Sequence, residues 1–144
     1  MARRPVAAGG TLFLDSEGLV KLSLDDARAQ AYLRRARARG ASVCVSAVTL
    51  TEVLRGGAKD APVHRVVKYL RVLPVTVEIG RRAGELLGVA GMSGHRCAID
   101  AIVAATALSC MRPVVLLTSD PDDLARLTDE PAVEKHERVV IQHV

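Results

Sequence analysis

The chain has 144 residues, a length that suits one domain built around one buried core. Apolar residues make up 49% of the sequence and charged residues 25%, which excludes wholesale disorder. Aromatic side chains are limited to Phe13, Tyr32 and Tyr69, too few for a surface that stacks several bases. We therefore expect one domain over residues 1–144, with a core of Val, Leu, Ile and Ala.

The net charge of +4 is unevenly distributed. Residues 1–72 carry 13 Lys and Arg against 6 Asp and Glu, whereas residues 73–144 carry 7 against 10. Of the 20 basic residues 16 are arginine, whose planar guanidinium suits phosphate or carboxylate. The basic half is compatible with a polyanionic partner, and residues 1–10, which include Arg3 and Arg4, are expected to form a short basic arm.

Cys44, Cys97 and Cys110 are odd in number and lack Cys-x-x-Cys spacing, which predicts neither a disulfide framework nor a zinc site. A reducing, cytoplasmic compartment is the expectation. The apolar stretch near the N-terminus is interrupted by Pro5 and Gly9, so no signal sequence or membrane contact is predicted.

Short β-branched runs alternate with segments of helical periodicity, beginning with a strand at Thr11–Leu14 that ends at Asp15. A helix is predicted next, opened by a capping box at Ser23 to Asp26 and ended by Gly40. Its buried face has the spacing i, i+3, i+4, i+7: Ala29, Tyr32, Leu33 and Ala36.

The alternation continues through the middle of the chain. The predicted elements are a strand at Ser42–Val45, a short helix at Thr49–Arg55, a helix from near Pro62 to Leu70, and a strand at Leu73–Val77. Pro74 indicates that this third strand lies at a sheet edge.

The last third of the sequence continues in the same way. Its predicted elements are a helix with an apolar stripe over Ile79–Ala90, a nearly uncharged central helix at Ala98–Leu108, a buried strand at Val114–Thr118, a helix at Pro121–Leu127 and a strand at Val139–Gln142. Strands that alternate with helices predict an α/β fold, with a parallel sheet of about five strands between two helical layers. In such sheets the ligand site lies beyond the carboxyl ends of the strands.

Acidic residues gather where that rule places the site. Asp15 ends the first strand, Glu52 lies in the helix after the second, Asp100 lies early in the central helix, and Asp120 and Asp123 follow the fourth strand. Carboxylates brought this close raise one another's pKa unless a cation lies among them. Ligands that are all oxygen favour Mg²⁺ or Mn²⁺ over zinc.

Each of these acids also has a local explanation. Asp15 could cap the turn after its strand, and Glu52 completes a Thr-x-x-Glu capping box with Thr49. Asp120 and Asp123 lie at a helix start, where acidic side chains favour the helix dipole.

Asp100 is the hardest to explain locally, because the segment CAIDAIVAATAL contains no other charge. A buried carboxylate must be compensated, either by a metal ion or by a helix N-terminus.

The segments LDSEGLVKL, VTLTEVLRG, HRCAIDAIVAATAL and LLTSDPDDL together resemble a PIN domain of the VapC ribonuclease toxin type. The resemblance covers nearly the whole chain and implies a three-layer α/β/α fold. It also implies a metal-dependent endoribonuclease in which Asp15, Glu52, Asp100 and Asp120 are catalytic. These four would hold Mg²⁺ or Mn²⁺ directly or through water, with Asp123 as an auxiliary ligand.

Family members usually form homodimers and are held inactive by a cognate antitoxin, and their cleavage of RNA arrests translation. By the same resemblance, Thr118 would orient the site. Two features depart from the family pattern: Glu17 stands where small or apolar residues are commoner, and ten residues precede the first strand. An alternative function is a catalytically silent PIN-fold module that acts with an antitoxin in a repressor complex.

Overall fold

Five short strands form one parallel sheet in the order β3-β2-β1-β4-β5, in a computed structural model that describes residues 9–144. The strands are β1 (Thr11–Leu14), β2 (Ser42–Ser46), β3 (Arg71–Leu73), β4 (Val114–Thr118) and β5 (Val140–His143). The chain adds β2 on one side of β1 and later returns to add β4 on the other side. The topological switch point therefore lies between β1 and β4, where α/β sheets bind their ligands.

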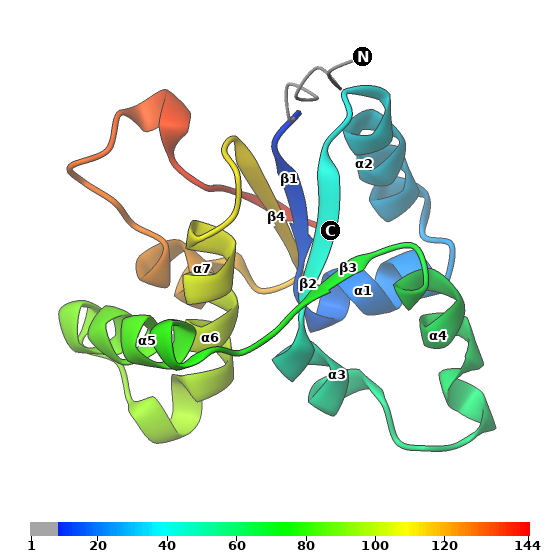
Figure 1. Ribbon diagram of the computed structural model, residues 1–144, viewed down its shortest axis with the longest axis horizontal. Helices are drawn as coiled ribbons and strands as arrows, with labels where there is room; N and C mark the ends of the chain where they lie inside the picture. Colours follow the sequence, from blue (N-terminus) through cyan, green and yellow to red (C-terminus); the bar gives the residue numbers. More distant parts are fainter. Residues whose placement is uncertain (1–8) are drawn as a thin grey trace, which may run out of the picture.

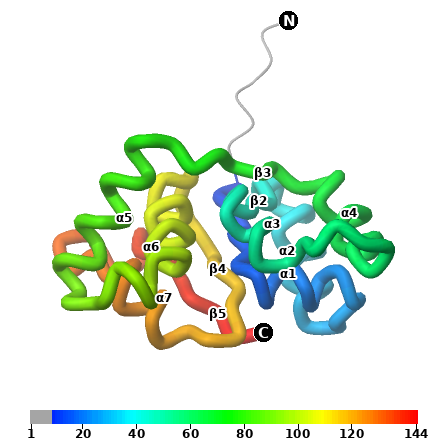
Figure 2. Tube along the Cα trace, turned by 90° about the horizontal axis from the view of Figure 1, so that it is seen from below, coloured from blue at the N-terminus to red at the C-terminus, as the bar shows by residue number. Residues whose placement is uncertain are grey.

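Helices cover both faces of the sheet, which confirms the three-layer α/β/α architecture (Figure 1). One layer contains α5 (Val77–Ala90), α6 (Gly94–Leu108) and α7 (Pro121–Leu127). The other side carries α1 (Ser16–Ser23), α2 (Ala27–Ala38) and α4 (Ala61–Val67), with α3 (Ala47–Val53) below the end of β2. Figure 2 looks along the strands and shows the sheet between the two helical groups.

Alternation along β1 divides the core in two. Leu12 and Leu14 pack with buried residues of α1, α2 and α4, whereas Phe13 packs against α5, α6 and α7. All three side chains are buried, as expected for a central parallel strand covered on both faces. The predicted aliphatic core is thus present, organised as one cluster on each face of the sheet.

The start of α1 is pressed directly onto β4. The Asp15 amide donates to the carbonyl oxygen of Leu117 at 3.2 Å. A Cβ atom at Gly18 would lie 2.8 Å from the same oxygen, closer than real Cβ contacts allow. Glycine at this position therefore permits the close approach that places Asp15 at the carboxyl edge of the sheet.

Three local predictions were wrong. Helix α1 was missed, and α2 is capped by the Asp26 side chain, which accepts from the Ala29 amide, and not by a capping box that starts at Ser23. The third strand is Arg71–Leu73, not Leu73–Val77, because Thr76 caps α5 and turns the later residues into helix. It does lie at a sheet edge, as Pro74 indicated.

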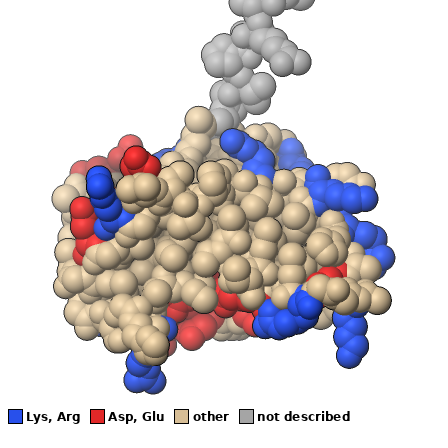
Figure 3. Space-filling view, turned by 60° about the horizontal axis from the view of Figure 1, so that its bottom comes forward, with Lys and Arg blue, Asp and Glu red and all other residues tan. Residues whose placement is uncertain are grey.

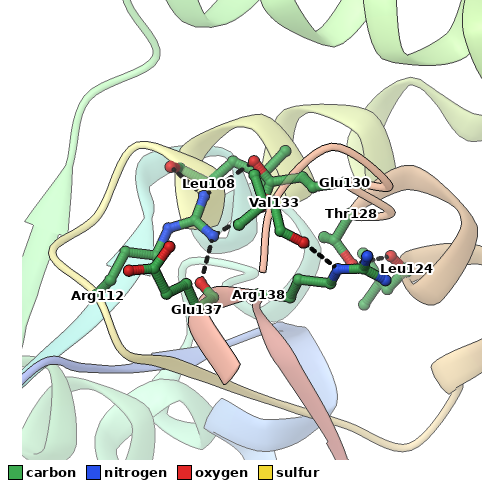
Figure 4. A network of polar contacts seen from close by, with 8 residues as sticks. All are labelled: Leu108, Arg112, Leu124, Thr128, Glu130, Val133, Glu137 and Arg138. Atoms are coloured by element: carbon green, nitrogen blue, oxygen red, sulfur yellow. Dashed lines mark hydrogen bonds and ion pairs between the residues drawn. The ribbon is translucent and has the colours of Figure 1, made fainter. Parts of the chain in front are cut away.

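Arg112 fastens the far end of α6 to the irregular segment between α7 and β5 (Figure 4). Its guanidinium binds both carboxylate oxygens of Glu130, at 2.7 and 3.2 Å. It also donates to the carbonyl oxygens of Glu137 and Leu108. Such a two-pronged, half-buried ion pair is geometrically specific, and it fixes the path of the chain into β5.

No single helix within residues 9–144 is long and apolar enough to cross a membrane. Helices α5 and α6 pass that test together, by length and composition, but they meet at a bend of 118°.

Candidate active site at the carboxyl edge of the sheet

Asp15 is the N-cap of α1, so its side chain is held at the end of β1. One carboxylate oxygen, Oδ1, accepts a hydrogen bond from the Gly18 amide at 2.8 Å. Burial raises the pKa of Asp15, against the lowering effect of hydrogen bonds from the Gly18 amide and the Thr118 hydroxyl. The carboxylate is thus in contact with α1 on one side and with the end of β4 on the other.

Glu52 lies in α3, the helix that follows β2, and its side chain is half-buried. Burial raises its pKa, and the nearby negative charges of Asp100 and then Asp15 raise it further. A hydrogen bond from the Ser16 side chain acts in the opposite direction. The charge of Glu52 is therefore repelled by carboxylates on two other elements, Asp15 at the end of β1 and Asp100 in α6.

The capping alternative for Glu52 is wrong. The N-cap of α3 is Ser46, whose hydroxyl accepts from the Val48 amide at 3.2 Å. Thr49, the expected cap, is buried inside the helix, and its hydroxyl has no hydrogen-bond partner within the described residues. The carboxylate of Glu52 therefore has no local structural role in capping.

Asp100 faces the same region from α6, the most buried helix. Burial raises its pKa, and the charges of Asp123 and Asp120 raise it further. Helix α6 begins at Gly94, earlier than predicted, with Ser93 as its cap. Asp100 therefore lies beyond the first turn, where the helix dipole no longer stabilises a carboxylate.

The end of β4 supplies Asp120 and Asp123 together with a buried hydroxyl. The Thr118 hydroxyl accepts from the Asp120 amide at 3.0 Å, which fixes the turn from β4 into α7. Asp120 occupies the N-cap position of α7, yet its side chain makes no capping hydrogen bond. Its carboxylate is free of that helix and remains exposed at the sheet edge.

The five predicted acids thus come together in one electrostatic neighbourhood, although not as a tight cluster. Figure 3 shows acidic side chains gathered between the two helical halves at the edge where the strands end. The ion pairs found in residues 9–144, Arg82–Glu85 and Arg112–Glu130, involve none of these acids. No ion pair in the described part of the chain therefore neutralises one of these five acids.

The donor set suits a hard divalent cation, because carboxylate and hydroxyl oxygens surround the edge. Across residues 9–144, however, no three His, Cys, Asp or Glu side chains lie close enough together to hold one metal ion. Magnesium needs no such cage, since it is commonly bound by one or two carboxylates and keeps several waters. The arrangement fits a water-rich magnesium site better than a site with four direct protein ligands.

A polar cavity of about 420 Å³ adjoins the acids at the start of α6. Its lining includes Arg96, Arg126, Ser93 and the candidate ligand Asp123. Arg126 is held in place, because its guanidinium donates to the Ala90 carbonyl oxygen at 2.8 Å. Two guanidinium groups therefore flank the acidic edge, in a space large enough for a phosphate group and its water.

A family comparison decides the classification. The PIN domain profile matches residues 12–130, which include every acid described above. The chain belongs to the PIN domain family. No curated protein shows a significant sequence match.

Solved structures share this PIN fold at low sequence identity. VapBC2 from Rickettsia felis, bound to a DNA fragment from its promoter, superposes with a TM-score of 0.67 at 15% identity, covering 93% of this chain and 98% of that chain. A toxin–antitoxin complex from Klebsiella pneumoniae gives 0.61 at 22%, covering 88% and 98%. FitAB bound to the IR36 DNA fragment gives 0.62 at 18%, covering 92% and 94%.

Sequence reasoning missed three polar residues of this edge. Ser16 was not assigned to the site, whereas its side chain lies close enough to Glu52 to lower the pKa of that carboxyl. Arg96 and Arg126 were not singled out, because they come from separate helices that meet only in the fold. Arg96 carried a usable signal, since it lies four residues before Asp100 and thus one helical turn away on the same face.

Proposed function

We propose that this PIN domain is a metal-dependent endoribonuclease and the toxin of a VapC-type toxin–antitoxin pair. It would hydrolyse RNA phosphodiester bonds in the cytoplasm and so arrest translation. The observation that carries the proposal is the position of Glu52, whose pKa is raised by burial and then by the charges of Asp100 and Asp15. Carboxylates from three elements that repel one another at a ligand-binding edge favour a catalytic cation site over a structural one.

Asp15, Glu52, Asp100 and Asp120 would hold Mg²⁺ or Mn²⁺ directly or through water, with Asp123 as an auxiliary ligand. Such a cation, when bound, lowers the pKa of a water molecule and neutralises charge on the phosphate that is attacked. The chain itself fixes the geometry of the donors. Asp15 is oriented by Gly18 and Thr118, and Glu52 by Ser16.

Arg96 and Arg126 are the candidates for holding the RNA backbone beside the cut. A guanidinium presents parallel N–H donors that match phosphate oxygens. Because both arginines line the cavity next to Asp123, they would place an adjoining phosphate within reach of the acidic edge. These contacts are independent of base identity and would supply affinity more than sequence preference.

The partners we propose are a cognate antitoxin and a second copy of the chain. Toxin–antitoxin complexes among the fold relatives support the first. Arg3 and Arg4 of the basic N-terminal arm lie outside the described residues, so the role of the arm as an additional contact stays a prediction. The assignment of residues 1–144 to one domain also stays a prediction.

The decisive experiment is cleavage of pooled total RNA by the purified, antitoxin-free protein in Mg²⁺ or Mn²⁺, with and without chelator. Asp100→Asn preserves shape and removes the charge, and it is expected to lower the cleavage rate by about 10²-fold or more. Asp129→Asn is the matched control, because Asp129 is exposed after α7 and outside the acidic edge. Equal activity of Asp100→Asn and wild type would contradict the proposed site.

One observation favours the second candidate, a catalytically silent module in a repressor complex. No three acids meet at metal-binding distance in the described part of the chain, and two of the fold relatives are complexes bound to DNA. A folded wild-type protein that cleaves no RNA, yet supports operator binding by its antitoxin, would establish this alternative.

A further inference from the structure

A second chemically distinctive site lies at the opposite, amino-terminal edge of the sheet. Cys44, in the middle of β2, and Cys110, just after the end of α6, line one cavity of about 310 Å³. Thr11 and Ser42, the first residues of β1 and β2, line the same cavity, which places it away from the acidic edge. Nothing in the proposed nuclease chemistry uses these thiols.

The fold brings the two thiols together, although they are far apart in the sequence. Cys110 packs against the buried cluster that contains Cys44, and both residues line the same cavity. The Cys110 thiol donates to the Thr106 carbonyl oxygen at 3.3 Å, which fixes its direction at the end of α6. Two thiols that share one cavity wall are the arrangement from which a disulfide can form.

Their surroundings divide the roles between them. The neighbouring Cys110 thiol lowers the pKa of Cys44 to about 7, and the Arg71 guanidinium contributes in the same direction. The Cys44 thiol, together with burial, raises the pKa of Cys110. Arg71 is paired with Cys44 in the register of β2 and β3 and lines the same cavity. Because Arg71 lies beside Cys44 on the neighbouring strand, Cys44 is the thiol assigned as the nucleophile, and Cys110 is the thiol available to resolve it.

Access to the pair is through the cavity. Cys44 is only 2% exposed, but it forms part of the cavity wall, and Cys110 is half-buried. A molecule the size of hydrogen peroxide fits this space, whereas a large protein surface does not reach Cys44. Cys97 lies near the start of α6, at the other end of that helix, and lines a different cavity.

We propose that Cys44 and Cys110 form a peroxide-reactive dithiol that closes to a reversible disulfide between β2 and the end of α6. The Cys44 thiolate attacks one peroxide oxygen, so that an S–O bond forms, the O–O bond breaks, and the other oxygen leaves as water after taking a proton. The Cys110 thiol then attacks the sulfenic sulfur, and the hydroxyl group leaves as a second water. Two thiols are oxidised and one peroxide is reduced; a small thiol reductant reverses the change.

This site is consistent with a reducing compartment, where disulfides are typically transient and redox-responsive. It does not rest on the proposed nuclease function, because its chemistry and its test involve neither RNA nor metal.

The test is stoichiometric oxidation of the reduced full-length protein with hydrogen peroxide, followed by alkylation and mass spectrometry of intact protein and peptides. The reduced protein is expected to take up three alkyl groups, and the oxidised protein one, on Cys97. A peptide pair linked through Cys44 and Cys110 is expected, and dithiothreitol is expected to restore all three reactive thiols.

Cys97→Ser is the control that leaves the pair untouched, and it is expected to lose both reactive thiols on oxidation. In Cys110→Ser the reaction is expected to stop at sulfenic acid on Cys44, which dimedone traps as a single adduct. Three alkylatable thiols after peroxide, a linkage that includes Cys97, or over-oxidation of Cys44 without a linkage would each overturn the proposal. The wild-type and Cys97→Ser results suffice if the Cys110 variant fails to fold.

Discussion

The substitution Gly18→Ala is expected to destabilise the protein, although the same change elsewhere in its helices stabilises it. The new methyl group would lie 2.8 Å from the Leu117 carbonyl oxygen and 3.3 Å from the Leu117 Cβ atom. The oxygen belongs to the backbone of the interior strand β4 and already accepts from the Asp15 amide. Neither group can move without disturbing the sheet, so α1 must lift away.

The magnitude follows from two opposed effects. Alanine is favoured over glycine inside a helix by about 1 kcal/mol. Forcing an additional methyl group into a close-packed contact costs about 1–3 kcal/mol. The net expectation is a loss of about 0–2 kcal/mol at Gly18, with a midpoint near 1 kcal/mol. Because Gly18 also donates to Asp15, the displacement would disturb that carboxylate as well.

Gly84→Ala is the matched control, since Gly84 lies in α5 and a Cβ atom there meets nothing within 4 Å. Urea unfolding of wild type and both variants measures the difference. Gly84→Ala is expected to raise the free energy of unfolding by about 0.5–1 kcal/mol, and Gly18→Ala to lower it. If Gly18→Ala stabilises the protein as much as Gly84→Ala, the close approach of α1 to β4 is refuted.

Three further predictions concern the acidic edge. The pKa values of Asp15, Glu52 and Asp100 are raised in the folded state. The native protein therefore keeps these carboxyl groups protonated up to a higher pH than the unfolded chain does, and the free energy of unfolding is expected to fall as pH rises through the carboxyl range. Asp100→Asn is expected to flatten this pH dependence and to gain on the order of 1 kcal/mol at pH 7 in urea unfolding; an unchanged pH slope would contradict it. Mg²⁺ or Mn²⁺ at 100 times its Kd is expected to stabilise the wild-type protein by about 2.7 kcal/mol. Calorimetry would show this as a rise in Tm of roughly 5–10 °C. A similar rise in Asp100→Asn would exclude that carboxylate as a ligand. Arg96→Gln and Arg126→Gln are each expected to weaken RNA binding measured in chelator. Each is also expected to reduce the slope of log affinity against log salt by about 0.7 per lost phosphate contact. The control variant Arg81→Gln, at an exposed position of α5, is expected to change neither quantity.

The large features of the fold could be predicted because parallel sheets leave clear signals. Four apolar residues followed by the β-branched Thr118 predict a strand at Val114–Thr118, and the structure gives the strand those same bounds. Asp15, Glu52 and Asp120 were expected at one edge because each follows a strand, and parallel strands end together. Connectivity alone thus placed acids from separate segments near one another.

Local competition explains what could not be predicted. Helix α1 has only eight residues and contains Gly18, which weakens the helical pattern, so its cap at Asp15 was interpreted as a turn. Thr49 matched a capping box, but Ser46 lies where β2 ends and takes the cap first. The shared cavity of Cys44 and Cys110 depends on where α6 ends relative to β2, which no spacing in the sequence reveals.

The structure also separates the local explanations of the acids from the functional one. Glu52 does not cap α3, Asp120 makes no cap to α7, and Asp100 lies beyond the reach of the α6 dipole. Asp15 does cap α1, but it uses only Oδ1 to do so. Capping and ligand binding are therefore compatible at Asp15, because the cap engages one of the two carboxylate oxygens. Capping and the helix dipole therefore do not account for Glu52, Asp100 or Asp120. A cation bound among the carboxylates would stabilise them together.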